Sequence, residues 1–173
     1  MGADKALLLL GGESAVERVV RICRAGGVAG VTVVRSRGAA PLPDGLAAES
    51  VLSEGSDMVE SVRAGVRALP PECRAVLVFP VDHAMVAEAT VSALLAALHR
   101  GAAVALPVSE GRPGHPIGLS RAVACEVNGD IVTLRDVVGR DPVRIVAVPV
   151  TDAWIHRDLD TPEDLAAARA EIG

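Results

Sequence analysis

A short apolar run in the middle of the chain sets the strongest limit on its fold. Residues 75–79 read Ala-Val-Leu-Val-Phe, show no helical spacing, and are followed at once by Pro80. A continuous apolar run of this length is typical of a strand buried on both faces of a parallel sheet. Asp82 is the first charged residue after it. Ligands of open α/β sheets bind at the carboxyl ends of the strands, so Asp82 is well placed to hold a cation, although an Asp can equally cap a following helix.

Helical and extended patterns alternate along the rest of the chain. The spacing of apolar residues predicts helices over residues 14–24, 58–69, 87–99, 121–127, 133–138 and 162–172. It predicts strands over residues 28–34, 75–79, 102–107, 117–119 and 143–150, and leaves a further apolar run at residues 5–10. This alternation indicates an α/β fold in three layers, with a mostly parallel, doubly wound sheet. The length of 173 residues fits one domain over residues 1–173.

The composition excludes several classes of function. Phe79 and Trp154 are the only Phe, Trp or Tyr residues, and the formal net charge is -5. Nucleic-acid binders need aromatic stacking platforms and a basic surface, so we expect no nucleic-acid partner. No apolar run approaches the roughly 20 residues of a membrane span, and no signal peptide is visible, so we expect no membrane partner. Cys23, Cys73 and Cys125 are widely spaced, which indicates buried free thiols in a reducing cytoplasm.

The start of the last predicted helix separates structural from functional acidic residues. Thr161 is suited to cap the helix, with Pro162 at its first position and Asp164 at the position of a capping-box carboxylate. Asp158 and Asp160 precede the cap and share a face if this segment is extended. Like charges at such a spacing are costly unless a cation lies among them, so a metal site is one hypothesis. A solvated acidic turn is the other.

A polar loop at residues 111–116 is the remaining candidate for ligand binding. It reads Gly-Arg-Pro-Gly-His-Pro and follows a predicted strand. Glycines let backbone amides approach an anion closely, and Arg112 can add a charge-assisted contact. His115 is flanked by Gly and Pro and does not lie on an apolar helix face. A plain surface turn is the alternative. The histidines and cysteines show no zinc-ligand spacing.

Four segments, in chain order, together resemble the MobA/MocA-like nucleotidyltransferases of molybdenum-cofactor synthesis, which have the GT-A fold. They are Ser61-Val62-Arg63-Ala64-Gly65, Pro80-Val81-Asp82-His83-Ala84, Gly114-His115-Pro116 and Asp158-Leu159-Asp160-Thr161-Pro162-Glu163-Asp164. The resemblance implies transfer of a nucleoside monophosphate from CTP or GTP to a phosphorylated acceptor such as molybdopterin, with release of pyrophosphate. It also leaves a homodimer open as the assembly.

The resemblance assigns roles to particular residues. Asp82 and Asp158 would hold Mg²⁺, and Lys5 would stabilise the triphosphate; Lys5 and Asp82 are therefore the expected catalytic residues. The substrate-binding residues implied by the same motifs are Ser61, Arg112, Gly114 and His115. The role of Asp160, as a ligand or as a residue that orients the last helix, stays open.

The beginning of the chain departs from the family pattern Leu-Ala-Gly-Gly-x-Ser-x-Arg-Met-Gly-x-x-Lys. One alignment places Lys5 on the family lysine, so that the first strand and most of the nucleotide loop have no counterpart here and Met1 is the Met of Arg-Met-Gly. In the rival alignment residues 5–10 are the first strand and residues 11–14 the Gly-Gly-x-Ser loop. We prefer the first, and expect the apolar residues 7–10 to be able to fill the central position of the sheet.

Two substitutions bear on activity. Ala84 stands where the family has a second Pro, and Asp57 puts a negative charge where a Gly is usual, near the expected nucleotide. The alternatives to an active enzyme of this family are therefore a non-catalytic homologue that serves in binding or assembly, and a nucleotidyltransferase for sugar phosphates or isoprenoid precursors on the same fold.

Overall fold

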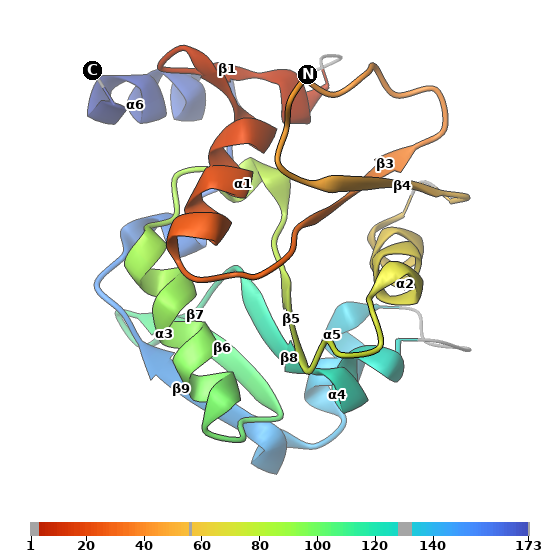
Figure 1. Ribbon diagram of the computed structural model, residues 1–173. Coiled ribbons are helices and arrows are strands. Elements are labelled where there is room, and N and C mark those ends of the chain that lie inside the picture. The colour runs from red at the N-terminus through yellow and green to blue at the C-terminus, as the bar shows by residue number, and fades with distance from the viewer. Residues whose placement is uncertain (1–3, 56, 128–132, 173) are drawn as a thin grey trace.

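Strands and helices alternate along the chain in the computed structural model, which describes residues 4–55, 57–127 and 133–172 (Figure 1). The strands are β1 (Leu9–Leu10), β2 (Glu13–Ser14), β3 (Thr32–Ser36), β4 (Glu49–Ser53), β5 (Ala75–Val78), β6 (Val104–Ser109), β7 (Arg112–Pro113), β8 (Ile117–Ser120) and β9 (Ile145–Pro149). The α-helices are α1 (Ala15–Ala25), α2 (Met58–Ala68), α3 (Glu88–His99), α4 (Arg121–Cys125), α5 (Leu134–Gly139) and α6 (Pro162–Ile172). Short 3₁₀ helices are η1 (Lys5–Leu7), η2 (Val81–His83), η3 (Pro142–Arg144) and η4 (Ala153–His156).

The β-structure is divided into a larger sheet and two separate pairs. In the larger sheet β8 lies between β5 and β6 and runs antiparallel to both, while β9 pairs with β6 in parallel and β7 forms a hairpin with it. β3 and β4 form a parallel pair of their own, and β1 and β2 an antiparallel one. β5, β6 and β9 therefore run in the same direction, as the α/β pattern predicts.

Helices cover both faces of the larger sheet, which confirms the three layers (Figure 1). On β6, neighbouring residues point to opposite faces: Val104 packs in a cluster with α2, α4 and α5, whereas Ala105 packs in a cluster with α3. A third cluster joins α1, the segment after η2, η4 and α6. Trp154 in η4 and Ala168 in α6 belong to it. Phe79 and Val81, which flank Pro80 just after β5, pack against this third cluster.

Polar side chains that the sequence places just before α1, α2, α4, α5 and α6 cap the starts of these helices. Thr161 and Asp164 exchange hydrogen bonds across the start of α6, with Thr161 N–H donating to Asp164 Oδ2 at 3.0 Å, which confirms the predicted capping box. Ser14 and Glu17 form the same motif at α1. Asp57 caps α2 by accepting from Glu60 N–H at 2.7 Å. Its charge is therefore directed at the helix amides.

Several predictions at the level of elements are wrong in informative ways. β4 was not predicted, because its polar residues Glu49, Ser50 and Ser53 hide an edge strand. β3 begins later than predicted, at Thr32, since residues 28–31 form the loop after α1. Residues 5–10 do not fill the central position of the larger sheet: Lys5–Leu7 form η1, and among the described residues Leu9 and Leu10 pair only with β2, in a small hairpin. The rival alignment is thereby disfavoured.

The strand β5 is half-buried along its whole length. The prediction that it is buried on both faces is therefore wrong. Its partner is β8, and among the described residues no strand pairs with its other edge. Of the cysteines, Cys23 is buried, Cys73 is half-buried and Cys125 is exposed, so the prediction of three buried thiols holds for Cys23 alone. Within the described ranges, no helix is both long enough and apolar enough to span a membrane.

Candidate active site

The candidate site lies at the carboxyl end of β5, where η2 carries Asp82. Pro80 ends the strand and stands at the cap position of η2. Asp82 does not cap the helix that follows, because the N–H of Ala87 at the start of α3 donates instead to Asp152 Oδ2 at 2.7 Å. The capping interpretation of Asp82 is thus wrong. Its carboxylate is left for another partner.

That partner is Lys5, in η1. The Lys5 ammonium lies 3.4 Å from Asp82 Oδ2 and also contacts Asp160 Oδ1. The acidic segment is held in place by its backbone, since Leu159 N–H donates to the Asp82 carbonyl at 3.0 Å. Leu159 is buried, so Asp158 and Asp160 flank a fixed point next to Asp82. Three segments far apart in sequence thus bring one cation and two carboxylates together.

The charges at this point suit a hard cation. The hydrogen bond with Asp160 raises the pKa of Lys5 above its ordinary value, and Asp82 adds to this effect against the cost of burial, so the ammonium stays charged. Asp82 Oδ1 is buried and has no hydrogen-bond partner among the residues that the structure describes. A buried carboxylate oxygen without a donor is costly unless a ligand engages it. Carboxylate oxygens are the ligands that Mg²⁺ prefers, so the donor set at Asp82 and Asp160 fits a divalent metal.

Two histidines border the same carboxylate. The rings of His83 and His115 lie with their centroids 4.8 Å apart. Burial lowers the pKa of His115 below its ordinary value, and His83 adds to the lowering, while Asp82 opposes it. The His115 imidazole is therefore neutral near pH 7, and within the described ranges its buried Nδ1 has no hydrogen-bond partner. A neutral imidazole can exchange a hydrogen bond with a substrate without adding charge.

The loop that carries His115 is shaped by Gly114. His115 N–H donates to the Ile155 carbonyl at 2.9 Å, and Gly114 N–H donates to the Pro107 carbonyl at 2.9 Å. A Cβ at Gly114 would collide with the same Ile155 carbonyl. This close approach requires glycine, which gives Gly114 a structural role beside the predicted substrate contact.

The other predicted residues are not joined to this cluster by any described contact. Ser61 is half-buried in α2, and Arg112 is exposed on β7, after a tight turn in which Glu110 and Gly111 have positive φ angles. Asp158 is exposed beside the Leu159 backbone bond. Among the described residues no cluster of three or more His, Cys, Asp or Glu is arranged to hold a metal.

Sequence reasoning missed the pair Asp4 and Arg35, which fixes the position of Lys5. Asp4 caps η1 by accepting from Ala6 N–H at 3.1 Å, and Arg35 on β3 grips the same carboxylate, with Nη1 3.2 Å from Oδ1. The Arg35 guanidinium holds the pKa of Asp4 below its usual value. Arg35 follows directly after the apolar residues of β3, and an arginine is unusual inside a strand. This was the sequence signal that could have pointed to an ion-pair partner for Arg35.

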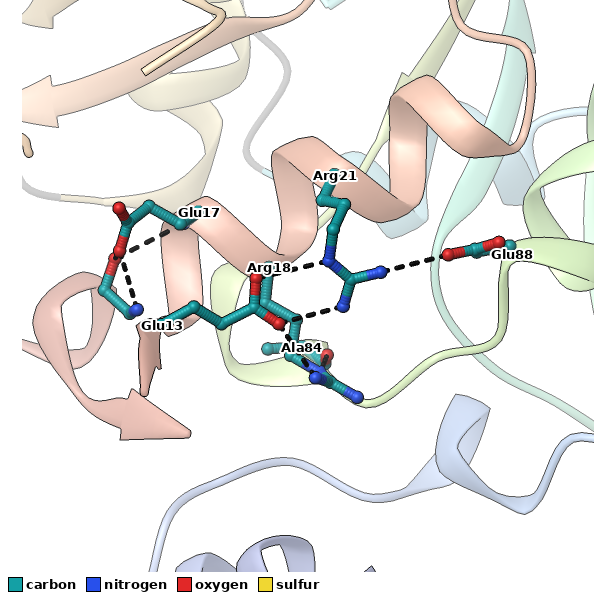
Figure 2. A network of polar contacts seen from close by, with 7 residues as sticks. Glu13, Glu17, Arg18, Arg21, Ala84 and Glu88 are labelled. Atoms are coloured by element: carbon teal, nitrogen blue, oxygen red, sulfur yellow. Dashed lines mark hydrogen bonds and ion pairs between the residues drawn. The ribbon is translucent and has the colours of Figure 1, made fainter. Parts of the chain in front are cut away.

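A polar network behind the site ties α1 to the turn after η2 (Figure 2). Arg18 Nε donates to the Ala84 carbonyl at 3.0 Å, and Arg18 Nη1 donates to Glu13 Oε1 at 2.9 Å. Figure 2 shows Arg21 bridging Glu13 and Glu88. Arg21 Nη2 donates to Glu13 Oε1 at 2.8 Å, and Arg21 Nη1 donates to Glu88 Oε1 at 3.0 Å. Because Ala84 comes two residues after Asp82, this network holds the backbone of the site against α1 and α3.

The family follows from the comparison of the whole sequence with family models. Residues 1–143 match the model of the MobA-like NTP transferase domain. The chain belongs to the MobA-like NTP transferase family. The match covers the segments that carry Lys5, Asp82 and His115. No curated protein sequence matches the chain.

Solved structures of nucleotidyltransferases share the fold of this MobA-like chain. The 2-C-methyl-D-erythritol 4-phosphate cytidylyltransferase from Thermus thermophilus is 23% identical, with a TM-score of 0.75 over 99% of this chain and 94% of that chain. A nucleotidyl transferase from Methanothermobacter is 20% identical, with a TM-score of 0.82 over 98% of this chain and 85% of that chain. The Mycobacterium tuberculosis H37Rv protein Rv0371C, in a complex with manganese, is 21% identical, with a TM-score of 0.75 over 98% and 93% of the two chains.

Proposed function

We propose that this MobA-like chain transfers a nucleoside monophosphate from CTP or GTP to a phosphorylated small molecule and releases pyrophosphate. The observation that carries the proposal is the meeting of Lys5, Asp82 and Asp160 at the carboxyl end of β5. This is the edge at which open α/β sheets bind their ligands. A triphosphate brings several negative charges there, and the site offers a cation and carboxylates that bind a metal.

In the reaction an oxygen of the acceptor phosphate attacks the α-phosphorus of the nucleotide. The bond from the α-phosphorus to the bridging oxygen of the β-phosphate breaks, and its electron pair leaves with pyrophosphate. Lys5 neutralises phosphate charge as it develops. His115 is neutral and can hydrogen-bond the acceptor without repelling Lys5. Asp82, with Asp158 or Asp160, would hold Mg²⁺, which supplies neutralisation and alignment of the phosphates when bound.

The acceptor is proposed from the sequence motifs, which favour molybdopterin or a related phosphorylated compound. A sugar phosphate or isoprenoid precursor is the second candidate, supported by the fold shared with the Thermus thermophilus cytidylyltransferase. The non-catalytic alternative loses part of its support. Asp57 is occupied as the cap of α2, so its charge is partly compensated by helix amides. The widely spaced cysteines favour a cytoplasmic setting for this reaction.

Calorimetric titration with CTP and with GTP, each in the presence of Mg²⁺, tests the proposal. We expect one of the two nucleotides to bind the unaltered chain, and Asp82→Ala to abolish the heat of binding. Glu72→Ala is the matched control: Glu72 is exposed before the amino end of β5, at the opposite end of the strand from Asp82. Glu72→Ala should bind as the unaltered chain does.

Each other outcome has a definite meaning. If neither nucleotide binds, the non-catalytic alternative is favoured and the proposed activity is wrong. If Asp82→Ala binds as well as the unaltered chain, the nucleotide site lies elsewhere. Release of pyrophosphate, followed with candidate phosphorylated acceptors, then identifies the acceptor class.

A further inference from the structure

The Lys5 ammonium contacts both Asp82 and Asp160, the carboxylates whose donor set fits a divalent cation. It is 3.4 Å from Asp82 Oδ2 and in contact with Asp160 Oδ1, so one ammonium is shared by the two carboxylates. The remaining oxygen of Asp82 is buried, and no group in the described part of the chain forms a hydrogen bond with it. Because one oxygen of the Asp82 carboxylate faces the ammonium and the other has no donor, the negative charge of Asp82 is only partly compensated. A metal that bound both carboxylates would meet the Lys5 charge directly.

The position of Lys5 is set by its own segment. Asp4 caps η1, of which Lys5 is the first residue, and Arg35 on β3 holds the Asp4 carboxylate through Nη1 and Nη2. The side chain of Arg35 is only 10% exposed, so this anchor is well shielded from solvent. With its backbone fixed, Lys5 stays at a high effective concentration beside Asp82 and Asp160.

We propose that Lys5 is a tethered counter-cation that competes with divalent metal for Asp82 and Asp160, so that the metal binds the free protein only by displacing it. The proposal rests on the proposed function, because it assumes that this site takes a metal. It adds a second role for Lys5. When the metal binds, the Lys5 ammonium leaves the two carboxylates and pairs with phosphate oxygens of the nucleotide. Metal and nucleotide are thereby expected to bind cooperatively, each favouring the state in which Lys5 has left the carboxylates.

The test is the affinity for Mn²⁺ without nucleotide, measured by electron paramagnetic resonance of the free ion during titration. Lys5→Gln removes the competing charge and should bind Mn²⁺ at least about tenfold more tightly than the unaltered chain. The reason is that two charges a few ångströms apart near a protein surface interact by more than the free energy of a tenfold change in affinity. Arg67→Gln is the matched control. Arg67 is an exposed cation in the last turn of α2, and its loss changes the net charge equally. This control should stay within about twofold.

A second variant keeps the test independent of the folding of Lys5→Gln. Asp4→Asn leaves Lys5 in the chain but weakens its anchor, so its Mn²⁺ affinity should fall between those of the unaltered chain and Lys5→Gln. Thermal unfolding followed by circular dichroism verifies that each variant is folded.

The results separate this proposal from the proposed function. Equal or weaker Mn²⁺ binding by Lys5→Gln, with binding still lost in Asp82→Ala, overturns the competition and leaves the metal site intact. Absence of Mn²⁺ binding by both the unaltered chain and Lys5→Gln overturns the competition together with the assignment of metal to Asp82 and Asp160. Tighter binding in Lys5→Gln but not in Arg67→Gln supports the proposal.

Discussion

The pair Asp4 and Arg35 shows how a single ion pair away from the proposed reacting groups can set the position of Lys5, the proposed catalytic cation. Arg35 donates to the Asp4 carboxylate, and the same carboxylate caps η1, so the backbone of Lys5 is fixed relative to β3. Lys5 then reaches Asp82, which follows β5. The geometry at the proposed metal site therefore depends on a contact made on another strand.

Replacing Asp4 by Asn should destabilise the protein in a pH-dependent manner. The pKa of Asp4 is lowered by Arg35, so its carboxylate contributes stability above the ordinary pKa of an Asp, and this contribution is lost as the pH falls through the lowered value. We expect Asp4→Asn to lower the free energy of unfolding by about 1 kcal/mol at pH 7. Urea unfolding of both proteins between pH 7 and pH 3 measures the difference, which should narrow below about pH 4. A difference that is constant with pH would show that the charge of Asp4 is unimportant.

Only those residues of the candidate site that lie within recognisable sequence motifs could be predicted from the sequence. Lys5, Asp82 and His115 lie in recognisable segments, and the structure brings them together. The motifs assign Asp158 to the metal and leave the role of Asp160 open, whereas the structure shows Asp160 in contact with Lys5. Alternation in an extended segment places both carboxylates on one face and does not rank them. Arg35 could not be assigned because its partner, Asp4, is remote in sequence and meets it only through the packing of η1 on the fold.

At the scale of elements, α3 starts without a capping side chain of its own. Ala87 stands at its cap position, and the missing acceptor comes from Asp152, whose carboxylate accepts from Ala87 N–H at 2.7 Å and from Thr90 Oγ1 at 2.8 Å. Asp152 also accepts from Trp154 N–H at the start of η4. One side chain thus fixes the starts of two elements that pack beside the site.

Asp152→Ala should lower the free energy of unfolding by about 1–2 kcal/mol, because the start of α3 loses its only side-chain acceptor among the described residues. Asp152→Asn keeps an acceptor oxygen and is the matched control, with a smaller expected loss. Chemical denaturation followed by circular dichroism gives both values. If the alanine variant lost no more than the asparagine variant, the cap would not contribute to stability.

The elements themselves were predictable where local signals and packing agree. α6 has the predicted bounds because its capping box marks the start unambiguously. β4 was missed because an edge strand with polar side chains has no period that distinguishes it from a loop. The half-exposure of β5 was beyond prediction, since the burial of a strand depends on its neighbours in the sheet and these are set by the whole fold.

At the scale of the whole molecule, the β3–β4 pair and the larger sheet that contains β5 are held together by side-chain contacts more than by backbone hydrogen bonds. β3 pairs with β4 and β5 pairs with β8, and among the described residues no ladder joins β3 to β5. The segment η1 links the two groups through charges, with Asp4 held by Arg35 on β3 and Lys5 held by Asp82 after β5. The proposed site is therefore assembled across the division of the β-structure.

This division predicts a pattern of hydrogen exchange. Glu49 N–H donates to the Val31 carbonyl at 2.9 Å, so Val33 and Arg35 direct their amides toward β4, whereas Thr32 and Val34 direct theirs to the other edge. By nuclear magnetic resonance we expect the amides of Thr32 and Val34 to exchange at least about tenfold faster than those of Val33 and Arg35, because opening a ladder bond costs free energy that an unpaired amide does not require.

Strand β6 supplies the internal control for this pattern, since it pairs with β8 on one side and with β9 on the other. Its amides near Val104 and Ala105 have partners at both edges, and should exchange slowly without alternation. Slow exchange at Thr32 and Val34, equal to that of β6, would mean that the edge of β3 is protected in solution and that the division is closed by backbone contacts. Fast exchange at all of β3 would mean that the β3–β4 pair opens as a unit. In that case Arg35 would leave Asp4 at each opening, and the position of Lys5 would fluctuate with it.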